Sequence, residues 1–446
     1  MRIKLVSFFL VFITVQVAAQ KTSSSPFSSF GFGEKDGMDH ATFTGLGNST
    51  ITYFDSTVVN FYNPSTYNTL GQGQPIFSLG VSSRLSFYNQ NTINVFKAAA
   101  FVDHFAMAFT LKKHFGLAFG LKPFSRKGYE IAERVAVGSD SLKYSYIGSG
   151  GTNQVFIGLS TNLIKLKKTT LSVGTNLSYL FGASTNERRS QLISGTELFG
   201  GIDYNTIRMN SFHYEFGAYF RQTLRERHDF TFAGVLEPAQ SLNATLDNYL
   251  FQGTVGNPNT YDTLFSTLDQ TGKIKIASTL NLGFNYNFKF KDTKKDNASR
   301  NSEIGIHFNY STTDWTTFSS TFDPNSELLA TSKLTFGIQY TPEYKFLENS
   351  INSSFLGRTR YRVGYYQYTL PYSADGSQLR DFGTTFGFGI PIMGQQSLSS
   401  VNVGFSLGKR ENGEANTMNE KYIGINFGVC LAPANFERWF KKRKLD

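Results

Sequence analysis

Large apolar side chains alternate with small or polar ones along most of the chain from residue 76 onward. In one run, apolar residues occupy every second position while Thr, Asn and Gly fill the positions between them; the apolar members are Leu280, Leu282, Phe284, Tyr286 and Phe288. A period of two is that of a β-strand, whose successive side chains point to opposite faces. The runs last about 10–16 residues, closer to a tilted membrane-crossing strand than to the five or six residues common in soluble sheets.

About fourteen such segments are expected, an even number as in single-chain bacterial barrels. They are 76–88, 95–110, 114–124, 153–164, 168–183, 211–224, 228–242, 274–290, 302–312, 329–344, 353–370, 378–393, 397–409 and 420–431. The second is the weakest, because its pattern breaks at Asp103 and His104. The pattern predicts an all-β fold, an antiparallel transmembrane β-barrel whose wall runs from 76 to 431.

Short and long connections alternate between these segments, as they do between the periplasmic turns and outer loops of such barrels. With both termini on the periplasmic side, Lys112-Lys113 and Leu166-Lys167 are short turns, and 125–152, 184–210 and 243–273 are long outer loops. These loops are expected to form either a ligand mouth or a docking surface for a neighbour.

The first nineteen residues have the pattern of a secretory signal peptide. Basic Arg2 and Lys4 precede an apolar stretch from Leu5 to Val17, and Ala18-Ala19 supplies the small residues of a cleavage site. The stretch is short for a membrane-spanning helix. An uncleaved N-terminal anchor is the alternative.

Composition supports a barrel over a soluble sandwich with the same alternation. Aromatic residues make up 15% of the chain, with 44 Phe and 23 Tyr, yet the mean hydropathy is only -0.25. Many lipid-facing rings beside many lumen-facing polar residues produce this combination. The formal net charge is +10. Because the chain is expected to be exported, we expect basic turns to face anionic lipid or protein partners, and we expect no nucleic acid ligand.

Signals for catalysis are absent from the sequence. Cys430 is the single cysteine, and the six His residues show no metal-ligand spacing. Gly45-Leu46-Gly47 is not a phosphate loop, because no strand-to-helix switch surrounds it. We therefore expect no enzyme activity, no metal and no cofactor.

Residues 20–75 lack strand alternation and are either a loose periplasmic arm or a plug inside the lumen. Several pieces here and downstream resemble the FadL-like outer-membrane transporters of hydrophobic compounds. These are Gly45-Leu46-Gly47-Asn48, Asn60-Phe61-Tyr62-Asn63-Pro64-Ser65, His114–Phe124 and Ser149–Asn153. The match covers the N-terminal third closely and the rest by architecture, and Ser65 stands where the family has alanine.

The resemblance implies a fourteen-stranded barrel in the bacterial outer membrane, closed by an N-terminal hatch that includes Asn63 and Pro64. It also implies capture of hydrophobic ligands such as long-chain fatty acids at the outer side and their lateral exit through a kinked strand wall. The plainer interpretation of Asn63-Pro64 is a turn.

Three arginines share one parity in a strand, Arg358, Arg360 and Arg362. If the aromatic residues between them face lipid, the three guanidinium groups stack along one lumen wall, since charge on the lipid face costs roughly 2–4 kcal/mol at the membrane midplane. They are candidates for binding a carboxylate head group. Alternatively, they pair with acidic groups of the hatch or lumen, such as Glu215.

The last strand is followed by a basic and aromatic tail from 432 to 446. Its candidate contact residues are Phe436, Trp439, Phe440, Lys441 and Lys442. The tail is expected to be an interfacial membrane anchor or a docking element for a periplasmic protein partner.

The sequence thus favours passive uptake of small hydrophobic molecules. A non-transporting barrel subunit of an outer-membrane machine for secretion or barrel assembly is the main alternative, and a water-filled porin is a third. An apolar pocket below the outer loops and an opening near the second and third strands would favour transport. A sealed lumen would favour the subunit.

Overall fold

The computed structural model describes residues 25–29, 31–35, 40–71, 75–111, 114–138, 140–193, 199–255, 257–290, 299–300, 302–325, 327–345, 356–392, 399–414 and 417–432. The expected signal peptide (1–19) and the tail residues Phe436, Trp439, Phe440, Lys441 and Lys442 lie outside the described residues. No helix in the described part of the chain is long and apolar enough to cross a membrane.

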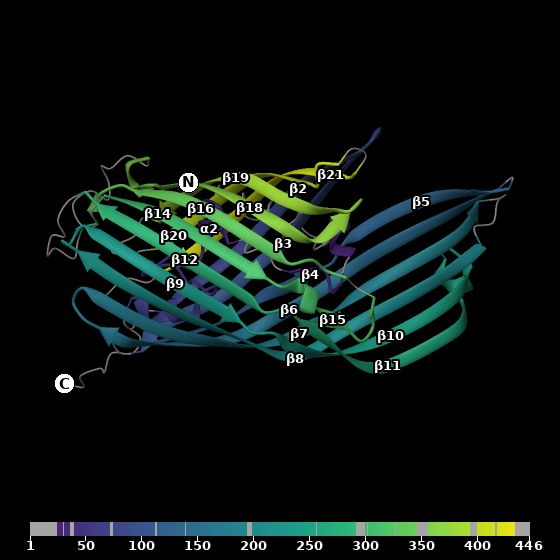
Figure 1. Ribbon diagram of the computed structural model, residues 1–446, viewed down its shortest axis with the longest axis horizontal. Helices are drawn as coiled ribbons and strands as arrows, with labels where there is room; N and C mark the ends of the chain where they lie inside the picture. Colours follow the sequence, from purple (N-terminus) through teal and green to yellow (C-terminus); the bar gives the residue numbers. More distant parts are fainter. Residues whose placement is uncertain are drawn as a thin grey trace, which may run out of the picture.

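The structure is a closed antiparallel barrel of fourteen strands (Figure 1), as the alternation predicts. The strands that cross the barrel wall singly are β2 (Ile76–Gln90), β3 (Ile93–Leu111), β4 (Phe115–Arg126), β6 (Asp140–Lys165), β7 (Thr169–Ile193), β8 (Phe199–Leu224), β14 (Glu303–Thr313), β16 (Thr331–Thr341), β18 (Arg360–Ala374), β19 (Ser377–Pro391), β20 (Ser400–Glu411) and β21 (Asn419–Leu431). Two further crossings are each broken in the middle: β9 (His228–Glu237) with β10 (Gln240–Thr254), and β11 (Asp262–Ile276) with β12 (Thr279–Lys289). Pairing of β2 with β21, from Phe77↔Leu431 to Asn89↔Asn419, closes the barrel.

Short elements complete the chain. They are β1 (Glu34–Lys35), α2 (Ala41–Thr44), β5 (Tyr129–Val137), β13 (Ser299–Arg300), β15 (Ser319–Ser320), β17 (Tyr344–Lys345) and 3-10 helices at Pro26–Ser29, Pro64–Thr69, Pro258–Thr260, Trp315–Thr317 and Leu356–Arg358.

The two faces of the wall have opposite chemistry. On β12, Leu282 is 49% exposed, whereas Asn285, on the other face, is fully buried. The same contrast recurs along the wall, with exposed Leu, Val, Ile and Phe outside and buried Ser, Thr, Asn and His inside. An apolar outer belt around a polar interior is the arrangement of a membrane-spanning barrel.

The break in the expected second strand is a β-bulge. Gly80 pairs with His104 and Val81 pairs with Val102, so Asp103 is an extra residue in β3. Both Asp103 and His104 are buried. A bulge turns two consecutive side chains toward one face, which explains why the alternation fails at this point while the strand continues.

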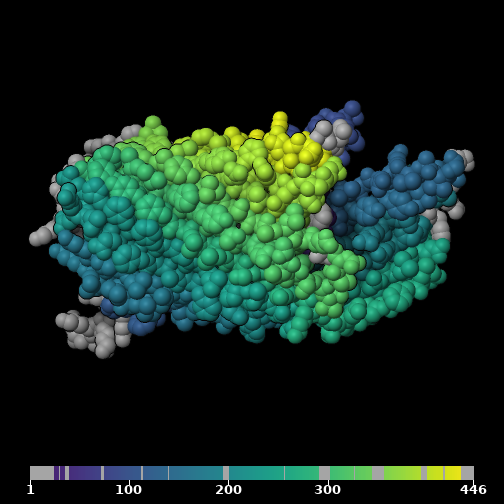
Figure 2. Space-filling view, viewed as in Figure 1, coloured from purple at the N-terminus to yellow at the C-terminus, as the bar shows by residue number. Residues whose placement is uncertain are grey.

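The three expected outer loops are wrong as loops: most of their residues form strands. The segments 129–150, 183–193, 199–210 and 244–272 extend β6, β7, β8, β10 and β11 and add β5, and together they make a sheet that we call the wing. It projects from one side of the barrel at the right of Figure 1, beside a recess that the space-filling view also shows (Figure 2). Beyond the membrane both faces of a strand meet water, so the apolar-polar contrast that reveals a strand in sequence is lost.

Residues 40–71 fill the lumen as a compact body that we call the hatch. Phe43, Leu46, Val59 and Tyr67 are fully buried. The backbone of the hatch packs directly against the backbone of the wall at positions where the inward-facing wall residue is glycine. A Cβ on Gly174 of β7 would lie 2.5 Å from the carbonyl carbon of Pro64, and one on Gly364 of β18 would lie 2.1 Å from the amide nitrogen of Gly47.

Candidate functional site in the barrel lumen

Asn63 and Pro64 lie inside the hatch and make a tight turn there. The Asn63 side chain accepts hydrogen bonds from the amide and the hydroxyl of Ser65 at 3.1 and 2.6 Å, and it donates to the carbonyl of Ile51 at 2.8 Å. Pro64 is the first residue of the 3-10 helix that Asn63 caps. Ser65 departs from the FadL pattern, and its hydroxyl supplies one of these hydrogen bonds, which an alanine could not make.

Two of the three arginines hold the hatch against the wall. Arg360 forms an ion pair with Asp55 of the hatch at 2.6 Å. Arg362 is buried and donates to the hydroxyl of Tyr53 in the hatch at 3.4 Å, as well as to Gln339 and Asn402 of the wall at 2.7 and 3.1 Å. Arg358 does not join them: it ends the 3-10 helix Leu356–Arg358 before β18 begins, so the expected ladder of three guanidinium groups is wrong. None of the three lines the cavity described next.

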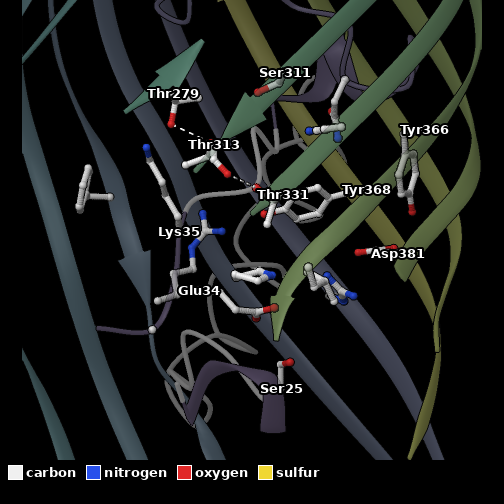
Figure 3. A pocket seen from close by; sticks show the side chains of 18 of the residues that line it. Ser25, Glu34, Lys35, Thr279, Ser311, Thr313, Thr331, Tyr366, Tyr368 and Asp381 are labelled. Carbon is white, nitrogen blue, oxygen red and sulfur yellow. Dashed lines mark hydrogen bonds between the residues drawn. The ribbon is translucent and has the colours of Figure 1, made fainter. Parts of the chain in front are cut away.

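A cavity of about 320 Å³ lies between the hatch and the outer half of the barrel (Figure 3). Its wall combines charged and polar side chains with apolar ones, among them Phe101, Phe124 and Trp315. Most strands of the wall contribute residues to it, and its charged residues include Arg84, Lys122, Arg126, Glu237, Asp381 and Arg410. A lining of both kinds offers apolar surface together with charged groups, and a buried charge is stable only where it has a partner.

The N-terminal segment crosses this cavity and is fixed by ion pairs. Glu34 accepts from Arg410 at 2.5 Å, and Arg410 also binds Asp381 at 2.8 Å. Lys35 contacts Glu237 at 2.5 Å, and the imidazole of His213 lies 2.9 Å from the same carboxylate. Figure 3 shows Glu34 and Lys35 reaching toward opposite walls of the cavity. Paired in this way, buried charges resist separation, because removing one partner leaves the other uncompensated.

Above the cavity, the apolar region of the outer lumen is filled by the chain itself. Phe27 and Phe32, both from the N-terminal segment, belong to a buried cluster with Phe124, Trp315 and Phe318. The ring of Phe32 lies 5.8 Å from that of Phe124 and 6.1 Å from that of Phe318, between ring centres. The place where an apolar ligand pocket was expected therefore holds aromatic side chains of this protein.

The wall is incomplete between β3 and β4. These strands pair only from Phe105↔Leu121 to Leu111↔Phe115, so they separate toward the outer side. We call this gap the seam. The guanidinium of Arg126, at the end of β4, lies 3.6 Å from the ring centre of Phe101 and 3.7 Å from Asp103, both on β3. Phe101 and Arg126 also line the cavity, so side chains close the seam where backbone pairing stops.

Lys122 is a buried cation of the cavity wall that lies against the hatch. Its ammonium lies 4.7 Å from the ring centre of Tyr62 and 5.2 Å from that of Phe61, and the residue is 8% exposed. Both rings belong to the hatch, and such cation–π contacts stabilise the ammonium. Among the described residues, no group of three His, Cys, Asp or Glu side chains is placed to hold a metal ion.

Sequence reasoning missed the residues that close the lumen, namely Phe27, Phe32, Glu34, Lys35, Arg126 and Arg410. Each has partners on other elements of the fold, and those of Glu34 and Lys35 lie 376 and 202 residues away, so no local pattern points to these contacts. One signal was present: Arg126 and Arg410 occupy inward strand positions, where a charge in a barrel needs a partner inside the lumen.

Comparison with solved structures gives the fold. The chain is similar to the monoaromatic hydrocarbon channel CymD, with 11% identity over 91% of this chain and 99% of that chain and a TM-score of 0.50. It is similar to the Ralstonia pickettii toluene transporter TbuX, with 12% identity over 89% and 99% and a TM-score of 0.51. A deltaS2S3 mutant of the monoaromatic hydrocarbon channel TodX gives 12% identity over 88% and 98% and a TM-score of 0.52. The fold is thus that of the FadL-like outer-membrane barrels.

No curated protein sequence matches this chain significantly. A protein-family model matches it over its whole length, from residue 1 to 446, and that model describes BamG. The chain therefore belongs to the BamG family.

Proposed function

We propose that this protein is a non-transporting barrel subunit of an outer-membrane protein complex, of the kind that serves secretion or barrel assembly. The observation that carries the proposal is the filled lumen. Phe27 and Phe32 occupy the apolar region below the outer rim, the hatch fills the inner half, and charged side chains surround the cavity between them. Membership of the BamG family, and not of a family whose model describes a transporter, supports the same proposal.

A subunit of this kind needs contact surfaces outside the membrane. The wing supplies one on the outer side. On the periplasmic side, the basic and aromatic tail with Phe436, Trp439, Phe440, Lys441 and Lys442 remains our predicted docking element or membrane anchor. Outer-membrane lipid contacts the apolar belt of the barrel in either case.

Native purification tests this proposal. The full-length protein is isolated from outer membranes in mild detergent, and protein partners and bound lipid are both quantified. We expect protein partners in fixed stoichiometry that survive a gradient. Recovery of a lone barrel with co-purifying hydrophobic compound would contradict the subunit function and favour transport.

A second candidate is passive uptake of small hydrophobic molecules such as long-chain fatty acids, and the seam favours it. The seam lies beside exposed Val102 and Phe105, and the cavity-lining side chains of Arg126 and Phe101 close it together with the N-terminal segment. For a lateral path, the N-terminal segment must move and the charged lining must be screened.

Two sets of variants address uptake. Removing the aromatic filling with Phe27→Gly and Phe32→Gly should raise uptake of a labelled long-chain fatty acid if the lumen is a blocked channel. Replacing Arg358, Arg360 and Arg362 by Gln should lower uptake if these residues bind the carboxylate, with barrel melting as the control for stability. Uptake equal to that of a strain lacking the protein, in all variants, would exclude transport.

A further inference from the structure

One strand of the wing has an unpaired edge. Within the part of the chain that the structure describes, β5 pairs along its whole length with β6, from Tyr129↔Gly148 to Val137↔Asp140, and with no second strand. On its other side lies the seam, because β3 leaves the wall at Phe105. An edge strand presents a row of amide and carbonyl groups that can pair with another chain.

The protein already adds a strand to the start of this edge. Glu34 and Lys35 of β1 pair with Arg126 and Ser125 of β4, which runs into β5. Just beyond, the Ser28 hydroxyl accepts from the amide of Gly128 at 2.9 Å and lies 3.1 Å from the Gly128 carbonyl. The N-terminal segment therefore occupies this edge as far as residue 128. The pairing of β1 with β4 shows that the edge has a geometry that accepts an added strand.

The side chains of β5 differ between its two faces. The hydroxyl of Tyr129 donates to Asn186 at 3.0 Å, and Lys127 donates to Asn186 and to the carbonyl of Gly31 in the lumen, so odd-numbered positions lie on the lumen side. Ile131, Val135 and Val137 share that face and are 39, 40 and 51% exposed. The opposite face carries Glu130 and Arg134 with two alanines.

This apolar face continues into the neighbouring strand. Across the pairing of β5 and β6, Ile131 stands opposite Tyr146 and Val135 opposite Leu142. Glu133, opposite Tyr144, lies between Ile131 and Val135 on this face. The apolar surface along the edge is therefore interrupted by one carboxylate. Exposed apolar surface at an unpaired edge is a feature that soluble sheets avoid unless a partner covers it.

We propose that the β5 edge receives an extended segment of a partner polypeptide by β-strand addition, continuing the line that β1 begins. This inference rests on the proposed subunit function, and it assigns the β5 edge as a surface through which the subunit binds a partner. The segment pairs with up to the nine residues of β5. It places apolar side chains against Ile131, Val135 and Val137, and a polar side chain against Glu133 between them. A polypeptide fits because only another backbone offers donors and acceptors at the spacing of a strand edge, which a lipid or a sugar does not.

Matched substitutions on the two faces of β5 test the proposal in native outer membranes. The lumen-face variant is Ile131→Asp with Val135→Asp. The control, Ala132→Asp with Ala136→Asp, adds the same charge to the same exposed strand on its other face. A photo-crosslinking amino acid at Val137 reports the contact, and hydrogen exchange of the assembled protein reports the amides of 129–137.

We expect one defined polypeptide adduct at Val137, reduced on the order of tenfold by the lumen-face variant and unchanged by the control, a difference of about 1.4 kcal/mol. Alternate amides of β5 should exchange slowly in the assembly and rapidly in the isolated protein. An adduct to the protein's own residues 20–24, to a second copy or to lipid would overturn the proposal, as would unprotected amides in an otherwise intact complex. That last outcome leaves the subunit function standing, whereas absence of any complex would remove both.

Discussion

At the scale of single residues, the hatch depends on side chains that must keep one protonation state. His40 caps α2: its Nδ1 accepts from the amide of Thr42 at 3.1 Å, and its ring stacks on His104 at 4.5 Å between ring centres. Burial, assisted by the charge of Arg362, lowers the pKa of His40 to about 3. The neutral ring is thus built into the hatch, because a protonated Nδ1 cannot accept the capping hydrogen bond.

We predict that acid loosens the hatch through His40. The folded pKa lies below the unfolded one, so between about pH 6.5 and pH 3 the unfolded chain binds a proton that the folded chain does not. Stability is therefore complete above pH 6.5 and falls by about 1.4 kcal/mol for each unit below it. Hydrogen exchange of residues 40–47 at pH 7 and pH 4.5 measures this. In His40→Asn, which keeps a capping side chain without titrating, the pH dependence should shrink, and an unchanged dependence would contradict the assignment to His40.

A second prediction at this scale concerns Arg410, which binds Glu34, Asp381 and Glu420 inside the lumen. Replacing it by Met leaves buried carboxylates uncompensated and should destabilise the barrel by about 3–5 kcal/mol. Lys409→Met is the control, since its partner Glu411 is partly exposed and such pairs contribute less than about 1 kcal/mol. Thermal unfolding in detergent compares the two variants, and equal melting temperatures would show that the lumen pairs do not hold the N-terminal segment.

At the scale of elements, the strands of the barrel wall were predictable from the sequence and the wing was not. The alternation identified every membrane crossing because lipid and lumen impose opposite chemistry on the two faces of a strand. The wing escaped because water lies on both sides of it, so Tyr144, Tyr146 and their neighbours show no contrast. The predicted position of Arg358 was wrong for another reason: alternation identifies a strand well but does not identify the residue at which the strand begins.

The packing of the hatch leads to a prediction on the glycines of the wall. Gly364→Ala places a Cβ 2.1 Å from the backbone of Gly47, so the hatch must shift, at a cost of about 1–3 kcal/mol. Gly357→Ala is the matched control, because no heavy atom lies within 4 Å of its added Cβ. Exchange protection of the amides of residues 45–49 should fall only in the first variant, and equal protection in both would mean that the glycine is not needed for close approach.

At the scale of the whole molecule, the closed lumen results from contacts that no local pattern encodes. β1 reaches β4 across ninety residues, and Glu34 meets Arg410 at the far end of the chain. The sequence pattern predicts that a polar residue lies on the inner face of a strand. It does not predict which residue of the N-terminal segment that side chain contacts. A plug in the lumen was therefore one of two possibilities that the sequence left open. That Phe27 and Phe32 fill the outer part of the lumen is seen only in the structure.

The final prediction locates the membrane along the long axis of the molecule. Leu282 on β12 and Leu264 on the wing part of β11 are similarly exposed, at 49 and 57%, but only Leu282 lies within the apolar belt of the barrel wall. Arginine at a lipid-facing position near the midplane costs roughly 2–4 kcal/mol, whereas in water it costs almost nothing. We therefore expect Leu282→Arg to lower the yield of folded, heat-modifiable barrel in outer membranes and Leu264→Arg to leave it unchanged. If Leu264→Arg were equally harmful, the wing would have to lie against lipid or a partner, and its aliphatic side chains would be covered rather than exposed to water.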